Sequence, residues 1–245
     1  MLLVTGGTGT LGRPLVSTLT TTGQDVRVLS RSFGSGRVVA DLTTGKGLAE
    51  ALAGVDTVVH CASDTQRLGK TDVAQTKNLV EAARAAGVSH LVYISIVGID
   101  RIPLSYYRRK LEVEEMIASS GIPWTTLRAT QFHNLLVDLY FGAQKSLPFV
   151  MVPRGTVQPI AVEVVADRLA ELAVGSPAGR VEDLGGPEVL AFADAARAYR
   201  SSLGKKPRAL SLPVVGKLAR SIADGSLTCP EQAHPGQTFE EFLQA

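Results

Sequence analysis

Three side chains near the middle of the chain have the types and spacing needed to deliver a proton to a carbonyl oxygen. Ser95 ends a predicted strand, and Tyr106 and Lys110 lie four residues apart on the predicted helix that follows, so they share one face. An ammonium group beside a phenol favours the phenolate and lowers the phenol pKa from about 10. Such a tyrosine gives its proton to a carbonyl oxygen while a hydride arrives from a nicotinamide. We therefore predict that Ser95, Tyr106 and Lys110 are catalytic, with Ser95 holding the substrate oxygen and Lys110 also holding the nicotinamide ribose.

The surroundings of these residues leave a structural interpretation open. A tyrosine and a lysine four residues apart also occur as a half-buried pair on a helix surface, and Tyr107 lies three residues before Lys110. Arg108 and Arg109 make the neighbourhood basic, either as a solvated face or as an attraction for an anionic ligand.

The N-terminal residues predict a binding site for the hydride donor. Residues 2–5 form an apolar run typical of a buried strand, residues 13–22 follow a helical pattern, and a glycine-rich loop separates them. Gly6 permits a tight turn, Gly9 lets the backbone approach a pyrophosphate, and Gly12 lets helix and strand pack closely. The predicted cofactor contacts in this loop are Gly6, Thr8, Gly9, Thr10, Leu11 and Gly12. The alternative is an ordinary strand-to-helix turn.

The end of the second predicted strand indicates which dinucleotide binds. When the cofactor is NAD, an acid about 20 residues past the glycines holds the ribose hydroxyls. Here the corresponding residues are Ser30, Arg31 and Ser32, and none is acidic. Arg31 can pair bidentately with a 2′-phosphate, and Arg37 lies near enough in sequence to add charge. We therefore predict NADP (NADPH) as the cofactor. The alternative is that Arg31 is a solvated surface residue.

Two further loops follow predicted strands at the same edge of the sheet. Asp41 and Leu42 follow the third strand, and Cys61, Ala62 and Ser63 follow the fourth. Loops at the carboxyl ends of parallel strands line the adenine and ribose of a bound dinucleotide, so we predict cofactor contacts from all five residues. Asp41 is equally suited to be a turn or helix-capping residue.

The residues after the sixth predicted strand are candidates for binding substrate. Gln131, Phe132 and His133 follow that strand at the edge where substrate is expected. Phe132 could stack on a flat organic ring or belong to the core. His133 could relay protons or be a hydrogen-bonded structural residue. The four histidines and two cysteines have no metal-ligand spacing, so we predict no metal site.

Short strands and amphipathic helices alternate in the first half of the chain. The predicted strands are residues 2–5, 26–30, 37–40, 57–60, 90–95 and 124–128, and the helices between them are residues 13–22, 47–53, 72–86 and 105–120. This alternation implies parallel strands joined by right-handed crossovers. We predict an α/β fold, a doubly wound Rossmann parallel sheet in one domain of residues 1–245. Its core is residues 1–130, and a small substrate-facing lobe comes mainly from residues 131–245. Beyond the sixth strand we predict helices at residues 131–144, 162–174, 192–203, 215–223 and 238–243, and strands at 148–152, 180–184 and 208–212.

Composition narrows the kinds of partner. The chain has 245 residues, 45% of them hydrophobic and 20% charged, and its net charge is +2. We therefore expect a small-molecule substrate and neither a nucleic acid nor a membrane as partner. The two cysteines, Cys61 and Cys229, fit a reducing compartment. We expect no signal or transit peptide and a cytoplasmic location, and the oligomeric state stays open.

Several stretches resemble a known family. The glycine spacing and the Ser…Tyr-x-x-x-Lys arrangement of Ser95, Tyr106 and Lys110 are similar to the short-chain dehydrogenase/reductase superfamily. Residues 86–88, 91–95, 107–115, 121–128 and 185–188 resemble its atypical, NmrA-like, NAD(P)-binding branch. The resemblance covers nearly the whole chain and implies the Rossmann fold and a nicotinamide cofactor. It also implies an aspartate contact to adenine at Asp41 and a small-residue loop bordering the cofactor at residues 61–63.

The resemblance leaves more than one function open. The branch contains nicotinamide-dependent reductases of quinones, ketones and isoflavones, and also catalytically silent redox sensors. Because Ser95, Tyr106 and Lys110 are retained, we predict an NADPH-dependent oxidoreductase that reduces a carbonyl or quinone group of a small organic molecule, with Tyr106 as proton donor. The alternative is a non-catalytic NADP-binding sensor of the NmrA type. A sugar-nucleotide epimerase or dehydratase ranks last because the chain is short for a nucleotide-sugar lobe.

Overall fold

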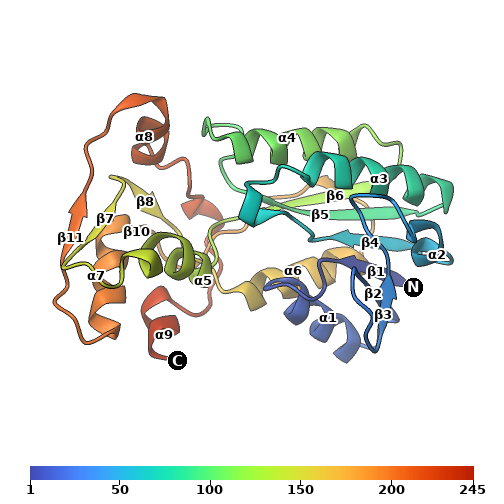
Figure 1. The fold of residues 1–245 in the computed structure, drawn as a ribbon, viewed down its shortest axis with the longest axis horizontal. Coiled ribbons are helices and arrows are strands. Elements are labelled where there is room, and N and C mark those ends of the chain that lie inside the picture. The colour runs from blue at the N-terminus through green and yellow to red at the C-terminus, as the bar shows by residue number, and fades with distance from the viewer. The chain divides into compact units, whose positions relative to one another are not determined.

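A computed structural model describes the backbone of residues 1–245 and all side chains except those of Gln66 and Leu139. The chain forms two compact units (Figure 1), and each one takes up separate segments of the sequence. The first unit consists of Met1–Ser95, Ser105–Leu127 and Glu163–Val181, and the second of Ile96–Leu104, Arg128–Val162 and Glu182–Ala245. The stretch Glu163–Val181 therefore belongs with the N-terminal half, although it lies in the part of the sequence assigned above to the lobe.

A seven-stranded parallel sheet forms the centre of the first unit, with the order β3-β2-β1-β4-β5-β6-β9. Its strands are β1 (Leu2–Thr5), β2 (Val26–Ser30), β3 (Arg37–Val39), β4 (Thr57–His60), β5 (His90–Ile96), β6 (Trp124–Ala129) and β9 (Gly179–Arg180). The strand order reverses between β1 and β4, and ligands of doubly wound sheets bind beyond the carboxyl ends of the strands at such a point. The predicted fold class is confirmed.

Helices cover both faces of this sheet. They are α1 (Gly12–Thr21), α2 (Leu48–Leu52), α3 (Asp72–Ala85), α4 (Ser105–Ala118) and α6 (Val162–Val174), with a 3₁₀ turn, η1 (Thr65–Arg67). Helices α3 and α4 lie on one face, and α1 and α6 on the other (Figure 1). Leu3, Val58 and Leu91 on three neighbouring strands are fully buried and join one core with Leu79 of α3 and Val113 of α4. Coverage on both faces explains why these strands are nearly continuous apolar runs.

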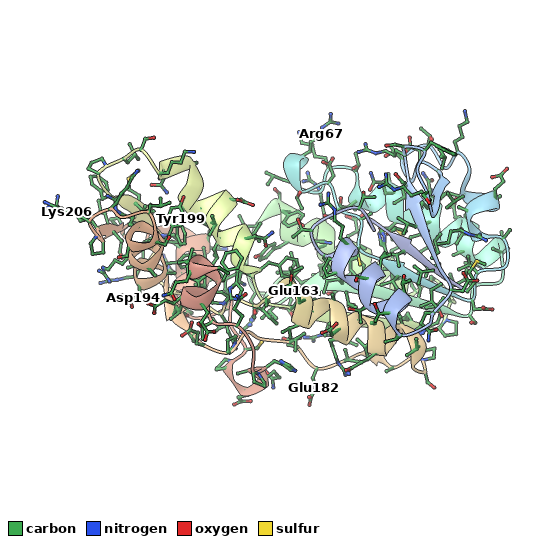
Figure 2. The ribbon with its side chains drawn as sticks, turned by 90° about the horizontal axis from the view of Figure 1, so that it is seen from below. Arg67, Glu163, Glu182, Asp194, Tyr199 and Lys206 are labelled. Atoms are coloured by element: carbon green, nitrogen blue, oxygen red, sulfur yellow. The ribbon has the colours of Figure 1, made fainter. Side chains whose placement is uncertain are left out.

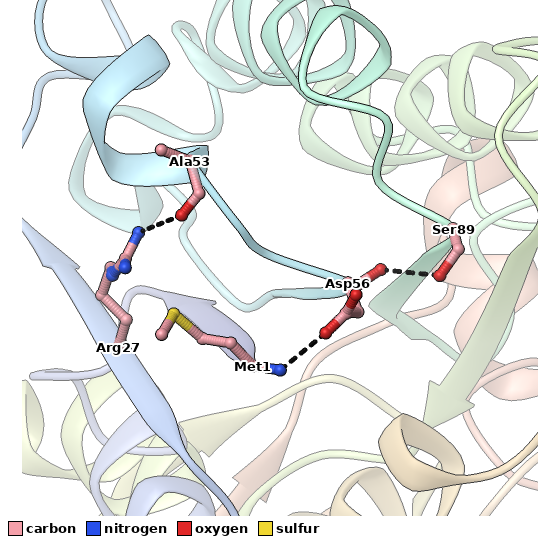
Figure 3. Close-up of polar contacts among 5 residues, drawn as sticks. All are labelled: Met1, Arg27, Ala53, Asp56 and Ser89. Atoms are coloured by element: carbon pink, nitrogen blue, oxygen red, sulfur yellow. Dashed lines mark hydrogen bonds and ion pairs between the residues drawn. The ribbon is translucent and has the colours of Figure 1, made fainter.

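Polar contacts fix the amino edge of the sheet, opposite the glycine loop (Figure 3). The guanidinium of Arg27 donates to the carbonyl of Ala53 (3.0 Å), just past the end of α2. The N-terminal ammonium of Met1 pairs with the Asp56 carboxylate (2.7 Å), and the Ser89 hydroxyl donates to the Asp56 carbonyl (3.0 Å). These contacts join the starts of β1, β4 and β5, so this edge is structural.

The second unit contains two small sheets and short helices. Strands β7 (Val150–Val152) and β11 (Ala209–Ser211) pair in parallel, and β8 (Thr156–Val157) and β10 (Leu190–Ala191) pair antiparallel. The helices are α5 (His133–Leu135), α7 (Phe192–Ser202), α8 (Gly216–Ala223) and α9 (Phe239–Gln244), with shorter turns η2 (Leu136–Phe141), η3 (Gly142–Gln144) and η4 (Pro230–Gln232). Tyr199 of α7, labelled in Figure 2, lies with its ring 5.5 Å from the buried ring of Phe141.

The predictions for the second half of the chain are confirmed less completely. The helices predicted at residues 162–174, 192–203, 215–223 and 238–243 are present within a residue or two. The helix predicted at residues 131–144 is wrong as one element, because α5, a π-helical turn and a 3₁₀ turn follow one another there. The π-helical turn meets the 3₁₀ turn at Gly142. A Cβ there would lie 2.9 Å from the Val137 carbonyl oxygen, so this backbone path depends on a glycine.

Among the described residues, none of the helices has both the length and the apolar character needed to span a membrane.

Candidate functional site

The glycine loop after β1 is held by contacts that only glycine permits. Gly6 has φ 68°, and a Cβ there would lie 2.8 Å from the backbone nitrogen of Ala62. A Cβ on Gly12 would lie 2.1 Å from the Gly6 carbonyl oxygen, inside the loop itself. The N–H of Gly9 donates to that same carbonyl oxygen (2.9 Å), which closes the turn. Gly6 and Gly12 are therefore needed by the fold.

Gly9 differs, because the fold itself leaves room at this position. A Cβ on Gly9 would meet one atom within 4 Å, the Gly6 carbonyl oxygen at 3.2 Å. Thr8, Gly9 and Thr10 are exposed, whereas Leu11 and Gly12 are buried under them. The exposed rim followed by the start of α1 offers backbone amides at a helix N-terminus, the arrangement that binds pyrophosphate. The residues present therefore fit a dinucleotide.

Arg13 is a charged group at this loop that the sequence analysis missed. Its Nε donates to the Thr8 carbonyl oxygen (2.8 Å), which holds the side chain against the rim. Its position in the first turn after the glycines is a signal that sequence reasoning could have used.

The end of β2 carries the predicted 2′-phosphate site. The Ser30 hydroxyl accepts from the N–H of Ser32 (3.1 Å) and shapes the turn there. Arg31 is exposed and makes no hydrogen bond or ion pair within the described part of the chain. Arg37, the first residue of β3, is also exposed, and it pairs in register with Val28 of the neighbouring strand β2. The guanidinium of Arg31 is thus accessible to an anion.

The loops after β3 and β4 serve the fold as well as the candidate site. Asp41 accepts from the N–H of Thr43 (2.8 Å), so the turn interpretation describes what this carboxylate does here. Leu42 is buried in the core. After β4, Ala62 packs against Gly6 and donates its N–H to the Thr5 hydroxyl (3.2 Å). Burial raises the pKa of the Cys61 thiol to about 12, so this thiol is not a thiolate at neutral pH.

Tyr106 lies in the first turn of α4 and contacts the loop after β4. Its hydroxyl is 3.2 Å from the Ser63 hydroxyl. Ser63 in turn donates to the buried carboxylate of Asp72 (2.6 Å), which also accepts the N–H of Asp64 (2.7 Å). Asp72 is the first residue of α3, where an acidic side chain ordinarily stabilises the helix N-terminus, so its role was not identified from the sequence.

Lys110 is buried one turn further along α4 and bonds a different tyrosine. Its ammonium donates to the hydroxyl of Tyr93 on β5 (2.9 Å) and lies 4.9 Å from the centre of that ring. Burial lowers the pKa of Lys110 and raises the pKa of Tyr106, which the negative charge of Asp72 raises further. The expectation that Lys110 lowers the pKa of Tyr106 is therefore wrong for the protein on its own. Burial destabilises the phenolate of Tyr106. Lys110 donates its hydrogen bond to Tyr93 and not to Tyr106.

A buried polar network centred on His60 packs against Tyr93. The His60 ring stacks on Tyr93 with centroids 5.6 Å apart. Its two nitrogens meet the hydroxyls of Thr5 (2.7 Å) and Thr76 (3.1 Å), which ties β1, β4 and α3 together. Burial lowers the pKa of His60 to about 3, so the ring is neutral at physiological pH. None of these partners was identified from sequence, because each pairing joins distant segments.

Ser95 lies near the carboxyl end of β5 and is buried. Among the described residues its hydroxyl has no hydrogen-bond partner. Buried hydroxyls normally have partners, so an unsatisfied one in this position fits a group that bonds a ligand. Its catalytic role stays a prediction.

The three residues predicted to bind substrate lie in the second unit and have partners there. Gln131 donates to the Leu227 carbonyl (3.0 Å), and the His133 Nε2 donates to the Gln237 carbonyl (3.0 Å). The His133 ring also stacks on Phe242, with centroids 5.1 Å apart. Phe132 is half-buried. These contacts match the structural interpretation of His133, and the substrate role of all three residues stays a prediction. No cluster of metal-ligating side chains is present among the described residues.

Known protein families and relatives share sequence similarity with the part of the chain that carries the glycine loop. The profile of a family described as NAD(P)H-binding matches residues 6–168. The photosystem II assembly factor Ycf39 of Trieres chinensis is 31% identical over 172 residues, which cover 63% of this chain and 53% of that protein, so the chain spans about half the length of that relative. The (4-alkanoyl-5-oxo-2,5-dihydrofuran-3-yl)methyl phosphate reductase of Streptomyces griseus is 29% identical over 259 residues, covering 100% of this chain and 86% of the relative.

Solved structures show the same fold. The NADPH-dependent quinone oxidoreductase QOR2 of Escherichia coli, in complex with NADPH, superposes with a TM-score of 0.81 at 24% identity, covering 100% of this chain and 99% of that one. The triphenylmethane reductase of Citrobacter sp. in complex with NADP(H) gives a TM-score of 0.81 at 19% identity with the same coverage. The family profile covers more than half of the chain, from the glycine loop at Gly6 into helix α6. The chain therefore belongs to the NAD(P)H-binding family, in the NmrA-like, atypical branch of the short-chain dehydrogenases/reductases.

Proposed function

We propose that this protein is an NADPH-dependent oxidoreductase that reduces a carbonyl or quinone group of a small organic molecule, with Tyr106 as the proton donor. The observation that carries the proposal is a short run of contacts at one edge of the sheet. Gly6 of the dinucleotide loop packs against Ala62, and the next residue, Ser63, contacts the hydroxyl of Tyr106. The phenol and the cofactor loop therefore share the carboxyl edge of β1 and β4.

The residues of this chain divide the chemistry among them. When bound, a reduced nicotinamide supplies the hydride. Tyr106 gives the proton to the substrate oxygen, and its raised pKa keeps the phenol protonated at neutral pH. Ser95 offers a buried hydroxyl to the same oxygen. Lys110, fixed by Tyr93, places a positive charge beside the site.

The preference for NADPH over NADH rests on Arg31. Its guanidinium is exposed at the end of β2, where an acid would hold the ribose hydroxyls of NAD. A guanidinium pairs bidentately with a phosphate, and the exposed side chain of Arg31 is open to such an anion.

The Streptomyces relative narrows the substrate class. Its name describes a reductase acting on an unsaturated, oxo-substituted ring that carries a phosphate ester, and its alignment spans this whole chain. We propose a conjugated carbonyl compound as the substrate. We also propose that the protein acts in the cytoplasm, because Cys61 and Cys229 are both free thiols.

One observation favours a second function, an NADP-binding sensor. Lys110 bonds Tyr93 and Tyr106 bonds Ser63, so the tyrosine and lysine of the proposed catalytic set do not bond each other here. The deciding experiment follows NADPH oxidation by absorbance with a panel of ketones, quinones and conjugated carbonyl compounds. Steady oxidation supports the reductase. Tight NADPH binding without turnover of any compound supports the sensor.

A further inference from the structure

The hydrogen bond from Ser63 to Asp72 determines which group donates in the contact between Ser63 and Tyr106. Asp72 is only 3% exposed, and its two carboxylate oxygens accept from the Ser63 hydroxyl (2.6 Å) and the Asp64 N–H (2.7 Å). A serine hydroxyl carries one hydrogen. Because that hydrogen is donated to Asp72, the 3.2 Å contact between Ser63 and Tyr106 has to be made by the phenol hydrogen.

We propose that Asp72 positions the proton of Tyr106 through Ser63, so that the phenol hydrogen is donated to Ser63 until a substrate oxygen takes it. Asp72 is a positioning residue in this scheme, since it acts on Tyr106 only through Ser63. The use of that proton in reduction rests on the proposed function, whereas the direction of the hydrogen bond does not.

The fold holds this arrangement from two helices that pack side by side (Figure 1). Asp72 is the first residue of α3, and Tyr106 lies in the first turn of α4. The loop between Ser63 and α3 packs on the phenol ring, since a Cβ on Gly69, which has φ 69°, would lie 2.9 Å from the ring carbon Cδ2. In the same loop, Thr71 donates to the Asp64 carboxylate (3.1 Å). The loop therefore fixes the ring and the carboxylate together.

Burial and the surrounding ionisable groups together set the pKa of Tyr106. The ionisable groups near Tyr106 and its neighbour Tyr93 are Asp64 in the loop, Asp72 on α3, Cys61 after β4, and Arg109, Lys110 and Glu114 on α4. Burial raises the pKa of Tyr106, and Asp72 adds to the rise. A Ser63 hydroxyl that donated to Tyr106 would lower this pKa, but its hydrogen is held by Asp72.

The Ser63→Ala variant tests the direction of the bond by the sign of its effect. If the phenol donates to Ser63, removing the acceptor destabilises the neutral phenol, so the pKa of Tyr106 falls. If Ser63 donates to the phenol, the same change raises that pKa. The measurement is an ultraviolet titration of phenolate in the full-length protein without cofactor. The signal of Tyr106 is isolated by subtracting the same titration of a Tyr106→Phe version of each protein.

The Asp72→Asn variant tests the part played by the carboxylate. Removing the negative charge releases the Ser63 hydrogen toward the phenolate, so the titration of Tyr106 moves down by about 1 pH unit or more. In the Ser63→Ala background the same substitution gives a smaller shift, because the bridge is absent. Equal shifts in both backgrounds, or a Ser63→Ala titration that is unchanged or moves upward, overturn the proposal.

These titrations are independent of the proposed reaction. A protein that never oxidises NADPH still reports the bond direction, so the failure of the proposed function and the failure of this inference are distinguishable. Circular dichroism at neutral pH checks that each variant is folded. If Asp72→Asn does not fold, the sign of the Ser63→Ala shift still decides the proposal.

Discussion

Replacing Gly9 with valine separates a glycine needed by the ligand from one needed by the fold. A Cβ at Gly9 meets only the Gly6 carbonyl oxygen at 3.2 Å, and Gly9 is not among the glycines with positive φ. Gly9→Val should therefore change the free energy of unfolding by about 1 kcal/mol or less. Its side chain would occupy the exposed rim of the loop, where backbone amides meet the pyrophosphate. Charge-assisted hydrogen bonds contribute about 1.5–3 kcal/mol each, so losing two raises the Kd for NADPH by about 10²–10⁴-fold.

The matched control is Gly12→Ala. Its added methyl group is smaller than the valine side chain, but the loop leaves no space for it at Gly12. Its Cβ would lie 2.1 Å from the Gly6 carbonyl oxygen, whereas ordinary contacts begin near 3.4 Å, so the backbone must move by more than an ångström. We expect a loss of about 1–3 kcal/mol of stability or more. Denaturant unfolding and fluorescence titration with NADPH measure both quantities for both variants. A folded Gly9→Val protein with unchanged NADPH affinity would refute the assignment of this loop to a pyrophosphate.

Three further predictions concern the cofactor choice and the stability of the first unit. Arg31→Asp should reverse the preference from NADPH to NADH in fluorescence titrations, and tighter NADH binding by the unmodified protein would contradict the role of Arg31. Arg27→Ala should cost about 1.5 kcal/mol in urea unfolding, because Arg27 donates to the carbonyls of Ala51 (2.6 Å) and Ala53 (3.0 Å); an unchanged midpoint would count against it. The lowered pKa of His60, about 3, makes the unfolded chain bind more protons than the folded one between pH 6.5 and 3, so stability falls as the pH is lowered through this window. His60→Gln should reduce that fall by about 1 kcal/mol per pH unit, and equal pH dependence in both proteins would argue against a neutral, buried His60.

The sequence predicted six of the seven strands of the first unit closely, because their signals are local. The seventh, β9, is Gly179–Arg180, shorter than the strand predicted at residues 180–184, and it joins the first unit and not the lobe. Apolar runs such as residues 57–60 fill strands with two covered faces, and the glycines that flank them mark turns. The helix predicted at residues 131–144 failed for the opposite reason. Its apolar residues are periodic, but the backbone widens into a π-helical turn at Leu136–Phe141, and no local pattern in the sequence marks that change.

The sequence predicted which residues belong to the candidate site better than it predicted the hydrogen bonds between them. The spacing of Tyr106 and Lys110 placed them correctly on one helix. It could not show that Lys110 bonds Tyr93, because that pairing depends on how α4 packs against β5. Asp72 was not identified either, because an acidic residue in the first turn of a helix usually stabilises the helix N-terminus. Its contact with Ser63 exists only once the loop has folded.

We propose above that Tyr106 donates the proton in an NADPH-dependent reduction. The most direct test compares NADPH oxidation by the unmodified protein and by Tyr106→Phe, using a ketone or conjugated carbonyl compound that the panel identifies as a substrate, with Tyr107→Phe as control. Tyr106→Phe should lower turnover by about 10²–10⁴-fold with little change in NADPH affinity, and Tyr107→Phe should have a mild effect. Full activity of Tyr106→Phe on that substrate would show that Tyr106 is not the proton donor.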